Sequence, residues 1–107
     1  MRTVELTRAA LADIEAIQTY FVIEVSRFDL AERFEQALRQ SLKEPARTPL
    51  IGSAWPTARP RLRQLRRWFV DGFSNHMIFY VVEKNRLVVL AVLHGAMALP
   101  SQLKGRH

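Results

Sequence analysis

Two apolar, β-rich runs separated by a two-residue spacer constrain the fold of this chain more than any other feature. The runs are His76 to Glu83 and Arg86 to His94, and the spacer is Lys84-Asn85. β-Branched and aromatic residues favour strands, and a two-residue spacer with an Asn that tolerates a left-handed conformation is typical of a hairpin turn. The segment therefore predicts an antiparallel β-hairpin.

Both faces of this predicted hairpin are apolar, because the alternation of a half-exposed strand is missing. The two sides of the first strand carry Met77, Phe79 and Val81 against Ile78, Tyr80 and Val82. The second strand likewise carries apolar residues on both of its sides. Helices of a chain this short can cover only one face, so we expect the other face to receive a partner.

The N-terminal half predicts a short strand followed by two helices. Residues 2 to 6 alternate loosely, and Thr7 is a plausible helix N-cap. Apolar residues then recur every three or four positions in the stripe Leu11, Ile14, Ile17, Phe21 and Val25. The polar residues between them are expected to face away from the core, and these are Asp13, Glu15 and Gln18.

The second helix is predicted from a capping box and a second stripe. Asp29 and Glu32 have the capping-box spacing, and Pro45 is expected to end the helix. Its apolar residues are spaced strictly by four, as Leu30, Phe34, Leu38 and Leu42. The two stripes predict a helical hairpin that lies on one face of a sheet.

Residues 45 to 62 contain four prolines and a glycine, which predicts a long ordered loop without regular elements. Arg63 to Val70 then resumes as a strand. The order strand, helix, helix, strand, strand, strand predicts an α+β fold: an N-terminal strand, a helical hairpin and a three-stranded antiparallel meander in one sheet. We expect residues 1–107 to form a single domain.

The net charge of +6 is unevenly distributed. Residues 1 to 44 hold six Lys/Arg and eight Asp/Glu, whereas residues 45 to 107 hold ten and two, so the balances are −2 and +8. The basic C-terminal half favours an anionic partner, either nucleic acid or an acidic protein segment. The absence of cysteine, of a signal sequence and of a long apolar run predicts a soluble cytoplasmic protein without disulfides or a thiolate metal site.

An ordered set of residues in the C-terminal half resembles the RelE/ParE superfamily of bacterial type II toxins, and most closely its ParE-like, plasmid-stabilisation branch. A Trp precedes a Gly-Phe-x-Asn-His-x-Ile-Phe-Tyr motif, and the last strand closes in Val-Leu-His-Gly-Ala. The residues that carry the resemblance are Trp68, Gly72, Phe73, Asn75, His76, Ile78, Phe79, Tyr80, Val92, Leu93, His94, Gly95 and Ala96.

The resemblance implies a growth-inhibiting toxin that is neutralised by a cognate antitoxin and acts without a cofactor. For the ParE-like branch it implies inhibition of DNA gyrase, a protein–protein mechanism rather than an enzymatic one. Operator DNA would be bound only through the complex with the antitoxin. The alternatives are a RelE-like, ribosome-dependent mRNA endonuclease, and an inactive relative that only binds antitoxin and operator DNA.

The chain departs from the branch at four positions. The branch usually places Arg-Asp after His-Gly-Ala and often has an Arg just after Phe-Tyr and another in the last strand. The corresponding residues here are Met97, Ala98, Val82 and Ala91. Three cationic positions and one acidic position are therefore apolar, and an activity that depends on them is in question.

Five arginines lie within nine residues, at 59, 61, 63, 66 and 67. Guanidinium groups suit both phosphate and carboxylate, so this segment predicts binding of the target or of an acidic antitoxin, against the alternative of a solvated edge. Strand alternation would turn Arg66 away from Arg61 and Arg63. The candidate binding residues are Arg61, Arg63, Arg66, Arg67, Trp68, Met97 and Leu99.

A ribonuclease would need a base, an acid and cations around one phosphate. The candidates are His94 or His76 as base, Tyr80 as acid, and Arg63 or Arg66 as the cation. The two histidines are expected near one another at the open end of the hairpin, with His76 beside Leu93. Too few acids lie nearby to complete a metal site, and a buried structural Tyr80 is the alternative to a catalytic one.

Overall fold

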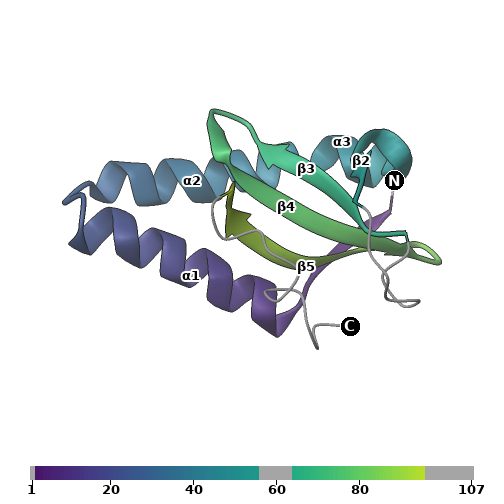
Figure 1. The fold of residues 1–107 in the computed structure, drawn as a ribbon, viewed down its shortest axis with the longest axis horizontal. Helices are drawn as coiled ribbons and strands as arrows, with labels where there is room; N and C mark the ends of the chain where they lie inside the picture. The colour runs from purple at the N-terminus through teal and green to yellow at the C-terminus, as the bar shows by residue number, and fades with distance from the viewer. Residues whose placement is uncertain (1, 56–63, 96–107) are drawn as a thin grey trace.

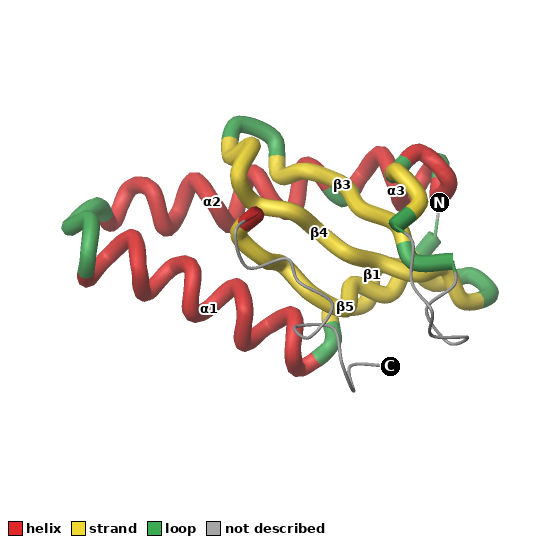
Figure 2. Tube along the Cα trace, in the orientation of Figure 1, coloured by secondary structure: helices red, strands yellow, loops and turns green. Residues whose placement is uncertain are grey.

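The computed structural model describes residues 2–55 and 64–95 of the 107-residue chain. Figure 1 shows a twisted sheet with a long helical hairpin along it, and Figure 2 shows the same trace by element type. In chain order the elements are β1 (Thr3–Leu6), α1 (Arg8–Ile23), α2 (Phe28–Ser41), α3 (Lys43–Arg47), the 3-10 helix η1 (Pro49–Ile51), β2 (Ser53–Ala54), β3 (Arg66–Val70), β4 (Phe73–Glu83) and β5 (Arg86–His94).

The five strands form one sheet in the order β1-β5-β4-β3-β2. β3, β4 and β5 form the predicted antiparallel meander, and β1 adds to β5 in a parallel orientation. β2 was not predicted and pairs antiparallel with β3 at the far edge. The α+β class expected from the sequence is therefore confirmed, and the sheet has one strand more than expected.

Helix α1 begins where the sequence predicts, but the residues that it buries differ from the predicted apolar stripe. The Thr7 hydroxyl accepts a hydrogen bond from the Ala10 amide at 3.1 Å, which confirms the N-cap. Ile14 and Phe21 are buried, but Leu11 is 51% exposed and Val25 lies beyond the end of the helix at 38% exposure. The predicted stripe is thus wrong at its two ends.

Two of the polar residues expected to face away from the core turn toward it. The Asp13 carboxylate accepts a hydrogen bond from the Val92 amide at 3.0 Å, which ties α1 to β5. The Gln18 side chain donates to the Ala31 carbonyl at 3.2 Å, which ties α1 to α2. Polar tethers of this kind satisfy backbone groups near the helix–sheet and helix–helix interfaces.

The capping box predicted for α2 does not form. Arg27 is the N-cap residue and makes no side-chain cap bond, and Asp29 lies within the first turn. The Asp29 carboxylate instead accepts two hydrogen bonds from the Arg27 guanidinium, at 2.7 and 2.6 Å. These bonds lower the pKa of the Asp29 carboxyl to about 2. The predicted apolar stripe is confirmed, because Phe34, Leu38 and Leu42 are buried and Leu30 packs against the same core.

The segment after α2 is more regular than the sequence suggested. Pro45 is the third residue of α3, where the missing N–H would have no partner within the helix anyway, so it does not end the helical region. Pro49 similarly begins η1. Residues 43 to 54 therefore form two short helices and a short strand, and the prediction of a loop without regular elements is wrong there.

The β4–β5 hairpin is confirmed, with two differences in detail. Lys84, rather than Asn85, has the positive φ of 54° that the first central residue of a primed hairpin turn requires. A bulge between Phe79 and Tyr80 shifts the register by one residue, so that His76 pairs with His94 and not with Leu93.

Both faces of the hairpin are buried. Ile78, Tyr80 and Val89 belong to the core beneath the two long helices, whereas Phe79, Val88 and Leu90 belong to a second cluster on the opposite face. Trp55 packs against this second cluster, with its ring 5.2 Å from that of Phe79. The expectation that this face stays open for a partner is therefore wrong.

Candidate functional site

The bulge in the hairpin places two imidazoles directly opposite one another. His76 on β4 pairs with His94 on β5, and their ring centroids are 5.4 Å apart at an interplanar angle of 89°. The His76 ring also lies against aromatic rings from both the helices and the sheet. Its centroid distances are 5.1 Å to Phe34, 6.0 Å to Phe21 and 6.2 Å to Phe73.

This aromatic environment disfavours the charged form of His76. Burial first, and the neighbouring His94 second, lower the pKa of His76 from its usual value. Its Nδ1 atom is buried and has no hydrogen-bond partner in the described part of the chain. An open hollow of about 420 Å³ lies beside the pair, lined by Ala16, Ile17 and Tyr20 of α1 together with the two histidines. The proximity of the two histidines, expected from the sequence, is confirmed.

Tyr80, the candidate acid, is buried on the same helix-covered face of the sheet as His76, but further along β4. Its hydroxyl donates to the Pro49 carbonyl at 2.6 Å and accepts from the Gly52 amide at 3.0 Å. Burial is the main cause that raises the pKa of Tyr80 above its usual value. Because it follows His76 by four strand residues, it lies about 13 Å further along β4, at about 3.3 Å per residue. The structure does not bring this phenol and the histidine pair together.

The described arginines of the basic segment interact within the chain. The Arg66 guanidinium donates to the Leu50 and Gly52 carbonyls at 3.2 and 2.6 Å. Arg67 lies over the rings of Trp55 and Phe69, at 5.3 and 4.9 Å from their centroids. Both groups therefore stabilise the segment around β2 and β3. Arg59, Arg61 and Arg63 lie outside the described residues.

Trp68, another candidate binding residue, is anchored in the fold. Its indole N–H donates to the Ser41 carbonyl at the end of α2, at 2.9 Å. The side chain packs against the main core. Met97 and Leu99, the remaining candidates, lie outside the described residues, so their binding role stays a prediction.

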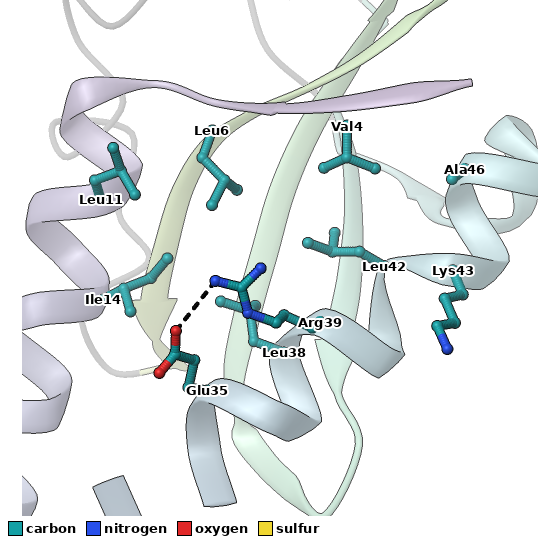
Figure 3. Close-up of a pocket in the computed structure, with 10 residues that line it drawn as sticks. All are labelled: Val4, Leu6, Leu11, Ile14, Glu35, Leu38, Arg39, Leu42, Lys43 and Ala46. Atoms are coloured by element: carbon teal, nitrogen blue, oxygen red, sulfur yellow. Dashed lines mark hydrogen bonds and ion pairs between the residues drawn. The ribbon is translucent and has the colours of Figure 1, made fainter. Parts of the chain in front are cut away.

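A groove that the sequence did not reveal runs between β1 and the helices. It encloses about 290 Å³, and Figure 3 shows Val4 and Leu6 pointing into it from β1 toward Leu38 of α2 and Leu42, the residue after α2. The ion pair between Arg39 and Glu35 crosses its rim at 3.1 Å. Its apolar lining comes from residues far apart in sequence, which is why no local motif signals it.

Large apolar side chains are also exposed at the end of the helical hairpin. Tyr20, Ile23, Val25 and Phe28 are 55%, 66%, 38% and 71% exposed, respectively. The sequence placed Val25 on the core stripe and gave no role to the others. A mismatch between hydrophobicity and exposure becomes visible only when the fold fixes which side of each helix faces the core.

Two kinds of feature are absent from the part of the chain that the structure describes. No group of three or more His, Asp or Glu side chains there is arranged to hold a metal ion. None of the described helices is long and apolar enough to cross a membrane.

Solved toxin structures share this fold. A chain described as the chromosomal ParDE TA system from P. aeruginosa superposes with a TM-score of 0.69 at 19% identity, covering 88% of this chain and 96% of that one. A copper-bound mutant toxin from Helicobacter pylori superposes with a TM-score of 0.61 at 11% identity, covering 92% of this chain and 100% of that one. At these identities the likeness concerns the fold alone.

Sequence comparison gives the family. No curated protein matches the chain. The family model of the ParE toxin of the type II toxin-antitoxin system, parDE, matches residues 4–99, which includes both helices of the hairpin and all five strands except the first residue of β1. A match over most of the chain, together with the shared fold, establishes that the chain belongs to the ParE toxin family of type II toxin-antitoxin systems.

Proposed function

We propose that this chain arrests bacterial growth by binding and inhibiting DNA gyrase, and that a cognate antitoxin neutralises it. Its membership of the ParE toxin family supports the toxin role. The ParDE description of a structurally similar chain supports an antitoxin partner. In this proposal the protein acts in the cytoplasm and contacts operator DNA only through the complex with its antitoxin.

The dispersal of the candidate catalytic groups favours a binding mechanism over RNA cleavage. Metal-free cleavage needs a base and an acid that both reach one phosphate. The Tyr80 hydroxyl is occupied by Pro49 and Gly52, at a different place on β4 from the histidine pair. Arg66, the described candidate for the cation, is hydrogen-bonded to the same segment as Tyr80. These groups support the fold, which leaves protein–protein inhibition as the better candidate.

Expression of the chain in bacteria without its antitoxin tests this proposal. We expect growth arrest with loss of negative supercoiling and DNA-damage signalling, while transcripts keep their normal ends. Mapping of transcript ends after induction separates the two mechanisms. Cleavage at codon-associated positions in translated messages would contradict gyrase inhibition and support the ribonuclease alternative.

The inactive alternative is tested in the same experiment. If the chain binds its antitoxin but never arrests growth, Met97 and Ala98 have removed an activity that other members of the branch retain. Restoration of arrest by Met97→Arg with Ala98→Asp would then identify the missing groups. Growth arrest by the unaltered chain would instead show that these two positions are dispensable.

A further inference from the structure

Four of the eight large apolar side chains that are exposed in the described part of the chain lie at one end of the helical hairpin. Tyr20 and Ile23 belong to the last turn of α1, Val25 to the connection and Phe28 to the start of α2. Figure 1 shows that this end of the hairpin extends past the edge of the sheet. We call these four residues the hairpin tip. A contiguous group of large exposed apolar side chains marks an interaction surface more often than a chance surface.

The fold does not need these side chains for its core. The hairpin is fixed to the sheet by the buried Phe21 and Phe34, whose rings lie 5.9 and 5.2 Å from that of Phe73. Tyr20 only touches Phe21 at the edge of this cluster, at 5.8 Å between centroids. Substitutions in the hairpin tip should therefore change binding more than folding.

Carboxylates border the hairpin tip. Glu24 follows Tyr20 and Glu32 follows Phe28 by one helical turn, so each lies beside an apolar tip residue. Both are exposed, and neither forms an ion pair within the described part of the chain. The nearby Arg27 and Arg33 instead both contact Asp29, at 2.6 and 3.9 Å. The border of the tip thus carries two carboxylates, Glu24 and Glu32, that no described arginine neutralises by an ion pair.

This combination selects one kind of partner. An apolar surface bordered by carboxylates complements a protein segment that has an apolar stripe flanked by Lys or Arg. Such a segment would cover Ile23 and Phe28 and approach Glu24 and Glu32 with its basic residues. Tyr20 also lines the hollow beside the histidine pair, so the surface continues toward β5.

We propose that the hairpin tip is the surface with which this toxin holds its cellular target, and that the target presents an apolar stripe flanked by basic residues. This inference rests on the proposed function in that a protein target is required. It differs from the expectation drawn from the arginine segment. The described Arg66 and Arg67 are engaged within the chain, whereas the tip has no covering element in the described structure.

Paired substitutions in the full-length toxin test the inference. The variant Ile23→Ser with Phe28→Ser should weaken inhibition of purified gyrase by about tenfold or more and abolish growth arrest, because buried anchors dominate interface energies. The matched control is Leu50→Ser, which alters a 70% exposed side chain on η1. Both the double variant and the control should keep the thermal melting midpoint and the antitoxin affinity of the parent.

Charge reversal at the rim provides a second, independent test. Glu24→Lys with Glu32→Lys should weaken gyrase inhibition, and the loss should shrink as salt is added, because salt screens exposed charges. The single reversal Glu24→Lys should already weaken inhibition more than Glu15→Lys, the same change on an exposed part of α1 further from the tip.

The outcomes separate this inference from the proposed function. If the unaltered chain arrests growth and the tip variants arrest it equally well, the inference is wrong and the proposed function stands. Loss of antitoxin affinity in folded tip variants would also overturn it, because the tip would then belong to the antitoxin interface. If the unaltered chain neither inhibits gyrase nor arrests growth, the proposed function fails, and the inference fails with it.

Discussion

At the scale of single residues, Tyr80 and Arg66 bind the same short stretch of chain. The Tyr80 hydroxyl contacts Pro49 and Gly52, and the Arg66 guanidinium contacts the Gly52 carbonyl. The approach is so close that a Cβ on Gly52 would lie 2.6 Å from the Tyr80 oxygen and 2.8 Å from the Arg67 carbonyl oxygen. A tyrosine and an arginine that suggest catalysis in the sequence therefore have structural roles here. Only their hydrogen-bond partners in the folded chain show this.

Replacement of Tyr80 by Phe should therefore destabilise the protein without a specific effect on activity. It leaves the Gly52 N–H and the Pro49 carbonyl without the hydroxyl, which costs about 1–3 kcal/mol when the groups are buried. Thermal melting measures this loss. Tyr20→Phe, which removes the hydroxyl of a 55% exposed side chain, is the control and should melt like the parent. An unchanged melting temperature for Tyr80→Phe, with abolished RNA cleavage, would identify a catalytic phenol instead.

The environment of His76 predicts how stability depends on pH. Because burial and His94 lower the pKa of His76 in the folded state, the unfolded state binds the proton more readily. The free energy of unfolding should be fully retained above the unfolded pKa of about 6.5 and should decrease as the pH falls below it.

The variant His76→Phe keeps an aromatic ring against Phe21 and Phe34 and removes the titrating group. Denaturant melts at pH 7.5 and 5.5 should show a smaller difference for this variant than for the parent. His94 is the titratable neighbour that faces His76, so His94→Phe is the companion measurement. Equal pH dependence in the parent and in His76→Phe would exclude His76 as the source.

At the scale of elements, the sequence predicts the parts that repeat a pattern. The β4–β5 hairpin, the Thr7 cap and the α2 stripe follow from local periodicity and are confirmed. The short α3 and β2 were missed because few residues carry their signal and Pro45 and Gly52 suggest a loop. The bulge in the hairpin was also missed, since no residue type in it requires a bulge. That bulge decides which residue faces His76.

The tether between α1 and β5 is another feature that periodicity cannot supply. A carboxylate at position 13 looks like a surface residue by its polarity, yet it accepts the Val92 amide. Asp13→Ala should reduce the free energy of unfolding by about 1–3 kcal/mol, because the Val92 N–H loses its partner. Chemical denaturation measures the effect. Glu15→Ala on the exposed side of α1 is the control, and equal losses for both variants would contradict the tether.

At the scale of the whole molecule, the sequence predicted the family, the α+β architecture and the position of the main core, and it failed on the surfaces. The second face of the β4–β5 hairpin is buried rather than open. Arg66 and Arg67 of the basic segment contact groups within the chain. The groove beside β1 and the hairpin tip combine residues from separate elements. Surfaces depend on which sides of all the elements meet, so a one-dimensional pattern locates them poorly.

A supercoiling assay with purified gyrase and the purified toxin tests most directly whether gyrase is the target. We predict that the toxin inhibits introduction of negative supercoils at concentrations near its affinity for the enzyme, and that stoichiometric antitoxin reverses the inhibition. The variant Ile23→Ser with Phe28→Ser should inhibit weakly, and Leu50→Ser should inhibit like the parent. Undiminished gyrase activity in the presence of a folded, antitoxin-binding toxin would contradict inhibition of gyrase by this protein.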